Sequence, residues 1–483
     1  MKSKWNSLLF FGFVLILAVS AIGCEKEPTM STTKPHIKPG TFLDTRLEEV
    51  VRNALDKTPT EEITAEELSS ITRLSDSYSG TISDLSGLEY CVGLTELILE
   101  RSKISDISPL ASLTSLSVLS LEDNQISDIS PLASLTSLTE LYTSDNNISD
   151  ISPLASLTNL THLGLSGNKV GGISSLRSLT NLTVLFVELS QNDISPLSSL
   201  INIKELWLWC DRIDDLTPLS YLKNLGTLVI YGNQVGDISS LASISALKKI
   251  HLNGEKINLK SFSSLKELED LSIISDTVSD IAPLSSLTNL KYLELDCNEL
   301  KDLEPLSNLT NLIVLKLHGS RISDITPLSS LTGLKRLAIS GSIDDISMSD
   351  LKSLNNLITL ELRGNKISDI SPLESLTNLR NLDLSWNQIS NINLREFRSL
   401  TGLEVLRLSE NQINNIGILA FFTNLEELDI SDNEIVDIGP LLANSGLSEG
   451  DTLDLSGNPI SQESEYIYIP YLEKRGVEVI YEP

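Results

Sequence analysis

The thirteen residues ISDISPLASLTSL run from Ile104 to Leu116 and recur unchanged from Ile126 to Leu138. A third copy, from Ile148 to Leu160, differs at one position, where Asn159 replaces a serine. A unit of 22 residues cannot bury its own leucines, so each copy must be covered by the next one. This spacing predicts a solenoid built of stacked, nearly identical coils.

Aligning the chain on its leucines extends the repeat to the phrase L-x-x-L-x-L-x-x-N-x-I-x-D-I-x-P-L-x-x-L-x-x, which is clearest from Leu138 to Asn159. About eighteen copies follow one another, and the first of them is degenerate. The second leucine of the phrase stands at Leu74, Leu97, Leu119, Leu141, Leu163, Leu185, Leu206, Leu228, Ile250, Leu271, Leu293, Leu315, Leu337, Leu360, Leu382, Leu406, Leu428 and Leu453.

The first part of the phrase alternates between apolar and polar residues, which is typical of a strand. We expect strands that include residues 97–99 and 293–295. An asparagine follows each strand, where the chain turns inward. A buried turn leaves N–H and C=O groups that water cannot reach, and an amide side chain can pair with both. We therefore expect this column to be buried: Asn124, Asn146, Asn168, Asn233, Asn298, Asn365, Asn387, Asn411, Asn433 and Asn458.

The segment D-I-x-P-L predicts a short 3₁₀ turn, because a Ser or Thr N-cap with proline at the first helical position starts such a turn. The expected N-caps are Ser108, Ser130, Ser152, Thr217, Thr326 and Ser371. The aspartates of this segment would stack along the solenoid and could hold a cation. Because they belong to the repeat rule, we expect each to accept from nearby turn amides instead: Asp106, Asp128, Asp150, Asp237, Asp324 and Asp369.

This phrase is that of a leucine-rich repeat, and its 22-residue length with D-I-x-P-L resembles the internalin type found in bacterial surface proteins. The resemblance covers about residues 71–460. It implies an α/β solenoid with parallel strands on the concave face and 3₁₀ turns on the convex face. It also implies a role in binding other macromolecules.

The flanking segments predict caps for the two ends of the array. In the helical cap expected at 41–70, six residues fall on one face of a helix: Leu43, Leu47, Val50, Val51, Ala54 and Leu55. A second helix should start at Thr64, with Glu67 closing a capping box and Ile63 packing on Leu68. At 461–483 we expect a helical turn, Gly476 and a final strand, which would make the array complete.

The N-terminus predicts export. Lys2 and Lys4 precede a short apolar run, which is typical of a signal peptide rather than a membrane span. The small residues before Cys24 resemble a bacterial lipobox, which implies a signal peptide over 1–23 and a lipid on Cys24. The alternative is an ordinary secretory signal with an incidental cysteine. Residues 24–40 have the composition of a flexible tether, so we expect a protein anchored outside the cytoplasm to the cell membrane or outer membrane.

The net charge of −29 disfavours nucleic acid and anionic lipid as partners. Cys210 and Cys297 share one repeat position but lie four repeats apart, roughly 19 Å at the spacing of strands, so no disulfide can join them. With Cys91 they should be unpaired, buried thiols. We also expect a monomer.

No catalytic signature is present, and we expect neither enzymatic activity nor a cofactor. No two of His36, His162, His251 and His318 share a repeat. No histidine and cysteine cluster has zinc spacing, and no glycine-rich loop has phosphate-binding form.

The strand positions that face solvent are small or charged over most of the chain, but their character changes between the third and eighth repeats. The candidate partner-binding residues are Tyr142, Phe186, Trp207, Trp209, Tyr231 and His251. Exposed aromatic residues often anchor a partner; the alternative is cross-strand packing alone. The repeat at Leu185, within this stretch, is one residue short. We expect a protein or glycan ligand on the concave face. The alternative function is a structural spacer in the envelope without a dedicated ligand.

Overall fold

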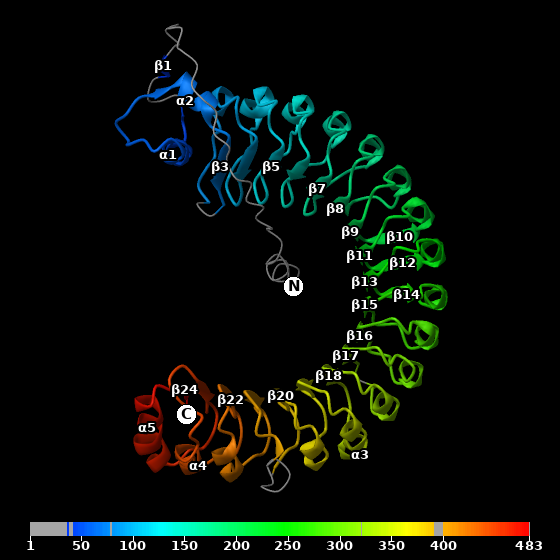
Figure 1. Cartoon of the computed structure of the whole chain (residues 1–483), viewed down its shortest axis with the longest axis vertical. Coiled ribbons are helices and arrows are strands. Elements are labelled where there is room, and N and C mark those ends of the chain that lie inside the picture. Colours follow the sequence, from blue (N-terminus) through cyan, green and yellow to red (C-terminus); the bar gives the residue numbers. More distant parts are fainter. Residues whose placement is uncertain (1–35, 38–41, 78–79, 320, 391–398, 483) are drawn as a thin grey trace, which may run out of the picture.

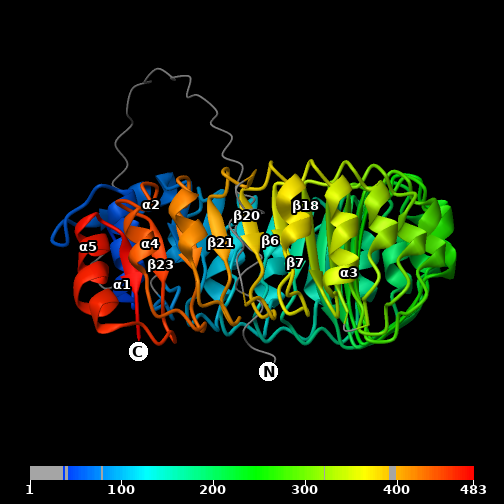
Figure 2. The ribbon, with the colours of Figure 1, turned by 90° about the horizontal axis from the view of Figure 1, so that it is seen from below.

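The computed structural model of the chain describes residues 36–37, 42–77, 80–319, 321–390 and 399–482. These residues form an open arc of coils, with strands on the inner, concave side and helical turns on the outer, convex side (Figure 1). Seen from below, the two ends of the arc lie at a similar height (Figure 2). The predicted leucine-rich-repeat solenoid is confirmed.

Nineteen parallel strands of the described residues form the main sheet. They are β3 (Arg73–Asp76), β4 (Glu96–Leu99), β5 (Val118–Ser120), β6 (Glu140–Tyr142), β7 (His162–Leu165), β8 (Val184–Leu189), β9 (Glu205–Cys210), β11 (Thr227–Tyr231), β13 (Lys249–Asn253), β15 (Asp270–Ile274), β16 (Tyr292–Asp296), β17 (Val314–His318), β18 (Arg336–Ser340), β19 (Thr359–Glu361), β20 (Asn381–Asp383), β21 (Val405–Arg407), β22 (Glu427–Asp429), β23 (Thr452–Asp454) and β24 (Glu478–Ile480). The strands predicted at 97–99 and 293–295 lie within β4 and β16 and are confirmed.

Two small sheets accompany the main one. In the middle of the arc, β10 (Arg212–Asp215), β12 (Gln234–Asp237) and β14 (Lys256–Asn258) pair in parallel just after the main strands. Near the N-terminal end, β1 (His36–Ile37) pairs antiparallel with β2 (Ile63–Thr64).

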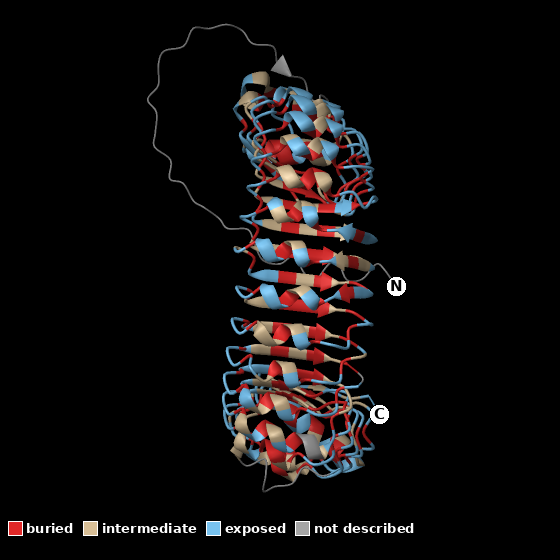
Figure 3. Cartoon of the chain, turned by 90° about the vertical axis from the view of Figure 1, so that its right-hand side faces the viewer, coloured by how far each residue is buried: buried red, intermediate tan, exposed pale blue. Residues whose placement is uncertain are grey.

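The leucines of the repeat form the core, because the register stacks them from coil to coil. Leu141 pairs with Leu163, which pairs with Leu185, and all three side chains are fully buried. Buried and more exposed residues therefore alternate along most of the strands (Figure 3), whereas β7, β11, β15 and β18 have three consecutive buried residues. The curvature of the arc follows because strands on the inside need only about 4.8 Å per coil, less than the helical turns outside.

The convex side carries a 3₁₀ turn in most coils, such as Ser130–Ser134. The prediction that the residue before proline is the N-cap is wrong. Ile129 is the N-cap, and Ser130 is already the first helical residue and forms no side-chain cap. The capping acceptor is Asp128, whose Oδ1 accepts the backbone N–H of Ser130 at 2.8 Å. The expected role of this aspartate column is thereby confirmed, and Asp106, Asp150, Asp237, Asp324 and Asp369 make the same bond.

The asparagine column connects neighbouring coils in both arms of the arc. The Nδ2 of Asn146 donates to the carbonyls of Thr143 and, in the preceding coil, Leu121 at 3.1 and 2.9 Å. Its Oδ1 accepts the N–H of Ile126 at 2.9 Å. Each such residue follows a left-handed residue, here Asp145 with φ 54°, which turns the amide inward. Burial is confirmed at Asn124, Asn146, Asn168, Asn365, Asn387, Asn433 and Asn458.

The prediction is wrong for Asn233 and Asn298, which are exposed, and Asn411 is only half-buried. In the central coils the strand continues for two more residues, and a small residue then takes the inward position. Cys297 is fully buried there, so alternation turns Asn298 outward, where its Nδ2 donates to Asp276 at 2.7 Å. Gly232 occupies the position equivalent to Cys297, directly before Asn233. Within the described residues, neither Gly232 nor Cys297 adopts a left-handed φ.

The three described cysteines, Cys91, Cys210 and Cys297, are free and buried, as predicted. Burial raises the pKa of all three thiols to about 12. They are therefore protonated at neutral pH and serve as small apolar residues of the core.

Helices lie at both ends of the array. They are α1 (Thr45–Ala54) and α2 (Ala65–Ser70) at the N-terminal end, α4 (Gly439–Leu442) and α5 (Ile469–Lys474) at the other, and a short α3 (Asp345–Met348) on the convex side. The predicted capping box between Thr64 and Glu67 is present. Helix α1 starts later than predicted, because the Asp44 side chain accepts from its first amides. Leu43 therefore lies before the helix and is exposed, and Ala54, the last residue of α1, is exposed as well.

The described residues include no helix that is both long and apolar enough to cross a membrane. The predicted signal peptide, Cys24 and nearly all of the predicted tether lie outside the described part of the chain.

Candidate functional site

The centre of the concave face is built by β8, β9 and β11, which are longer than the strands of the arms. In β9 the side chains of Leu206 and Leu208 point into the core and are at most 1% exposed. Alternation then places Trp207 and Trp209 on the concave side, where both are half-buried. The greater strand length matters, because it adds a further column of concave positions, to which Trp209 belongs.

Four aromatic rings form one continuous row on this surface, which we call the aromatic row: Phe186, Trp207, Trp209 and Tyr231. The ring centroids of Phe186 and Trp207 lie 5.6 Å apart with planes tilted by 37°. Trp207 and Trp209 stack at 6.0 Å, and Trp209 and Tyr231 stack at 5.6 Å. Each ring is partly covered by its neighbours in the row and remains partly exposed to solvent.

The other two candidate residues lie on the same side of the sheet but outside the ring contacts. Gly164 stands between Tyr142 and Phe186 in the strand register. On the opposite side, Val229 separates His251 from Trp207, and Val229 is only 1% exposed. Both outlying residues are half-buried.

Acidic side chains hold the polar groups of several of these residues. The Nε1 of Trp207 donates to Glu205 Oε1 at 2.7 Å, and the hydroxyl of Tyr142 donates to Glu140 at 3.1 Å. His251 Nε2 lies 3.0 Å from Asp270 Oδ1. Burial alone would raise the pKa of Asp270, but His251 and Lys249 outweigh it, so the pKa lies below its ordinary value. Asp270 is therefore ionised at neutral pH.

The concave surface on the N-terminal side of the aromatic row is acidic. Strands β4 to β9 and β11 carry Glu96, Glu140, Glu188 and Glu205 but no Lys or Arg. Glu122 lies half-buried just after β5, where burial and the neighbouring charge of Glu100 raise its pKa. Like charges are therefore held close together on this part of the surface.

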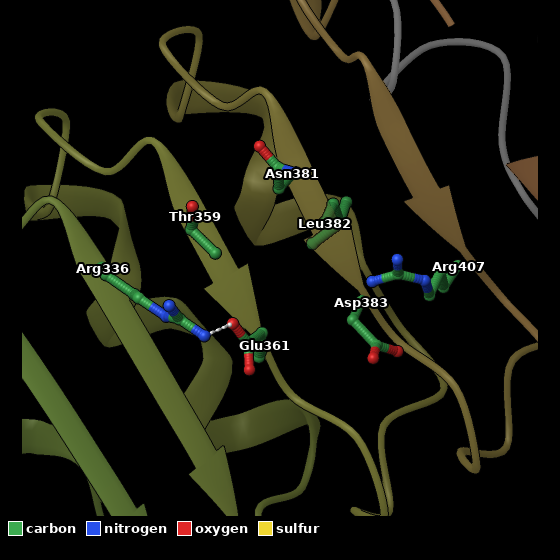
Figure 4. A pocket seen from close by; sticks show the side chains of 7 residues that line it. All are labelled: Arg336, Thr359, Glu361, Asn381, Leu382, Asp383 and Arg407. Atoms are coloured by element: carbon green, nitrogen blue, oxygen red, sulfur yellow. Dashed lines mark hydrogen bonds and ion pairs between the residues drawn. The ribbon is translucent and has the colours of Figure 1, made fainter. Parts of the chain in front are cut away.

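Beyond the aromatic row, the C-terminal arm holds a second feature that the sequence analysis missed. A polar hollow of about 240 Å³ is lined by Arg336, Thr359, Glu361, Asn381, Leu382, Asp383 and Arg407 (Figure 4). Arg336 Nη2 lies 2.7 Å from Glu361 Oε1, and Arg407 Nε lies 2.7 Å from Glu427 Oε1. These charged residues were visible in the sequence, but each ion pair runs diagonally between strands, because Arg336 is in register with Thr359 and Glu427 with Val405.

The described residues contain no group of three or more histidine, cysteine or acidic side chains that could hold a metal ion. The arrangement on the concave face offers contact area, hydrogen-bond acceptors and negative charge. These are the means of recognising a partner by surface complementarity.

The comparisons with known proteins agree with this architecture. The family described as "Leucine Rich repeats (2 copies)" matches residues 114–156, 158–199, 355–397 and 401–447. A search of curated proteins found no match.

Several solved structures are similar. The internalin InlF of Listeria monocytogenes is 33% identical, with 80% of this chain and 94% of the internalin covered and a TM-score of 0.44. The functional domain of InlJ from the same organism is 22% identical, with 88% and 83% covered and a TM-score of 0.54. A leucine-rich repeat protein of Leptospira interrogans is 20% identical, with 86% and 97% covered and a TM-score of 0.60. With its repeats, its solenoid and these matches, the chain belongs to the leucine-rich repeat proteins and is similar to the internalins of Listeria.

Proposed function

We propose that this chain is a non-enzymatic, lipid-anchored protein of the cell surface that binds a protein partner on its concave face. The aromatic row is the observation that carries the proposal. Its four rings are contiguous and half-exposed, in a chain of which only 5% is aromatic. Tryptophan and tyrosine dominate the residues that contribute most to protein interfaces.

The shape of the molecule supports this assignment. Leucine-rich repeat proteins typically bind partners, and the concave surface of a solenoid can contact a large ligand over many coils. Tyr142 and His251 flank the aromatic row on the same side and would extend the contact. Fold alone does not determine function, so the proposal depends on these side chains.

The predicted export signal supports the location. A lipid on Cys24 would hold the solenoid at a membrane, with the residues from Cys24 to the start of β1 as the tether, since His36 and Ile37 already pair with the N-terminal cap. A lipoprotein cysteine that carries two or more acyl chains binds a membrane stably, whereas a single chain does not. Mass spectrometry of the mature N-terminus tests this part. Diacylglycerol on Cys24 is the expected result, and an unmodified cysteine or cleavage elsewhere would refute it.

Binding is tested with the double variant Trp207→Ala/Trp209→Ala. We expect the truncations to cost about 2 kcal/mol or more of binding free energy, the range of interface hot spots. The measurement is quantitative capture of partners from the organism's own surroundings, followed by affinity measurement on the captured protein. Trp386→Ala removes an exposed tryptophan outside the aromatic row, and Asp429→Lys changes a distant concave position. Both controls should bind like the unmodified chain.

The same variants separate binding from a purely structural role. If the rings only stabilise the sheet, the double variant should melt at a lower temperature and capture the same partners. If the proposal holds, capture is lost while the melting temperature changes little, because the leucines on the opposite face form the core. Capture of a glycan in place of a protein would refute the assignment of the partner.

A further inference from the structure

We infer, building on the proposed function, that the partner presents a basic polypeptide segment in which apolar side chains alternate with Lys or Arg. The segment would place its apolar side chains on the aromatic row and its basic side chains on the acids beside it. The inference combines the ring geometry with the uneven distribution of charge on the concave face.

The ring geometry favours polypeptide over sugar. Trp209 lies between Trp207 and Tyr231, with interplanar angles of 24° and 16° to them. Much of its face is therefore covered by its neighbours, and the centre of the row offers little open ring face. Sugars bind aromatic residues across an open ring face, whereas aliphatic and aromatic side chains pack well against edges.

The charge around the aromatic row is negative and uncompensated. Glu188 is in register with Trp209, and Glu205 accepts the indole proton of Trp207. Within the described residues, neither of these glutamates forms a salt bridge, and neither does Glu140 in β6. Glu188 and Glu205 thus lie beside the rings without a salt-bridge partner, and Glu140 adds a negative charge two strands from Phe186.

The other arm of the arc differs from the aromatic row in that several of its acids have basic partners. There the acids are paired across neighbouring strands: Arg336 with Glu361, Arg380 with Glu404, and Arg407 with Glu427. On β16 and β17, Lys316 Nζ lies 3.7 Å from Glu294 and 5.5 Å from the centre of the Tyr292 ring. Beside the aromatic row, by contrast, Glu188 and Glu205 have no such partner within the described residues. Complementary charge at a rim speeds association and excludes wrong partners.

The test uses three synthetic peptides of equal length, in which leucine alternates with lysine, glutamate or serine. Binding to the purified full chain is followed by tryptophan fluorescence, because Trp207 and Trp209 lie in the proposed contact. The background variant Trp386→Phe removes the signal of an exposed tryptophan elsewhere. We expect the lysine peptide to bind at least tenfold more tightly than the other two, and to lose this advantage at about 0.5 M salt, where charges are screened within a few ångströms.

Two matched double variants test which acidic side chains contribute to binding of the lysine peptide. Glu188→Gln/Glu205→Gln keeps the acceptor oxygens and removes two charges, so the lysine peptide should bind about fivefold to twentyfold more weakly. Glu361→Gln/Asp383→Asn removes two charges from the paired arm and should change its affinity less than twofold. Loss of affinity in the second variant alone would overturn the assignment of the site.

The outcomes also separate this inference from the proposed function. Binding of the serine peptide as tightly as the lysine peptide, dependent on Trp207 and Trp209, would refute the basic segment and leave protein binding intact. Failure of the lysine peptide to bind overturns the inference. If the double tryptophan variant also captures its native partners normally, the proposed function fails too.

Discussion

The arms and the centre of this solenoid end their strands in two different ways. In the arms, a three- or four-residue strand is followed by a left-handed residue and a buried asparagine, as at Asp145 and Asn146. In the centre, from β8 to β18, the strand has five or six residues and a small residue faces inward, as at Gly232, Gly254 and Cys297. Both solutions keep the same leucine core.

The difference explains where the aromatic row can exist. A short strand offers concave positions only on the two sides of its central leucine, whereas a long strand adds one more beyond the next core residue. Trp209 and Tyr231 occupy this added position in β9 and β11. The centre loses the hydrogen bonds of the buried amide and gains sheet surface for contact. A solenoid can therefore change its binding surface by changing how a strand ends.

The largest expected effect on stability comes from removing a buried asparagine side chain in one of the arms. Asn146→Ala leaves the buried N–H of Ile126 without a partner and removes one of the two amide donors to the carbonyl of Leu121, the other being Asn124. We expect a loss of about 3 kcal/mol in the free energy of unfolding. Asn298→Ala, at the equivalent sequence position in the centre, should cost less than about 0.5 kcal/mol because that side chain is exposed. Denaturant unfolding of both variants measures the contrast, and equal losses would contradict it.

A second prediction concerns enlarging one of the small inward-facing residues in the central coils. A Cβ added at Gly254 would lie 2.5 Å from the carbonyl oxygen of Gly232 in the neighbouring coil. Gly254→Ala should therefore destabilise the chain by about 2 kcal/mol, the usual range for overpacking. The control is Gly172→Ala, since an added Cβ there meets no atom within 4 Å. Thermal melting followed by circular dichroism compares them, and a neutral Gly254→Ala would show that the coils can separate.

A third prediction sharpens the role of the left-handed residue in the arms. Glu410 has φ 55°, a conformation that is strained for a residue with a side chain. Glu410→Gly should raise the free energy of unfolding by about 1 kcal/mol, because the relieved strain exceeds the added backbone entropy. Glu361→Gly, in an ordinary strand position of β19, should lower it. A destabilising Glu410→Gly would mean that the turn is not strained.

The smallest expected effects are pH-dependent and have opposite signs. Hydrogen bonds from Ser130 hold the pKa of Asp128 below its ordinary value of 3.8, so its ionised form stabilises the fold above about pH 4. That contribution disappears as the pH falls through the lowered pKa. Asp128→Asn should therefore be less stable than the unmodified chain at pH 7, and equally stable in strong acid.

Glu122 should behave in the reverse way. Burial, with the nearby charge of Glu100, raises its pKa above the ordinary value of 4.5, so ionisation costs more in the folded state than in the unfolded one. Glu122→Gln should be more stable than the unmodified chain at pH 7, and this gain should vanish well below pH 4.5. Urea midpoints measured from pH 3 to 7 show both trends; parallel curves for the two variants would contradict the assigned shifts.

The sequence predicted the solenoid because every repeat experiences the same surroundings, so a fixed spacing outweighs local preferences. It failed at Asn233 and Asn298, since the burial of an asparagine depends on the backbone of the residue before it. Only the structure reveals whether that residue is left-handed, as Asp145 is, or extended. The type of the preceding residue was not a reliable signal, because glycine precedes the exposed Asn233 and also the buried Asn168.

The candidate site was predictable in part. Period-two alternation placed Trp207 and Trp209 on one side of the sheet, but it could not predict that the rings stack and become half-buried. Tyr142 and His251 stay outside the ring contacts because Gly164 and Val229 intervene, and both were visible in the sequence. The ion pairs around Arg336 and Arg407 depend on side-chain conformations across strands.

The direction of the asparagine bonds has a consequence for how the chain is made. Asn146 donates to a carbonyl 25 residues earlier and accepts an N–H 20 residues earlier, so it completes the coil that precedes it. A coil therefore becomes fully bonded only when the next one arrives. In a chain that is synthesised from its N-terminus, the coils can fold one after another, beginning against α1 and α2. At each stage only the last coil lacks its full set of hydrogen bonds. The coils that carry the aromatic row would then fold only after all coils of the N-terminal arm have folded.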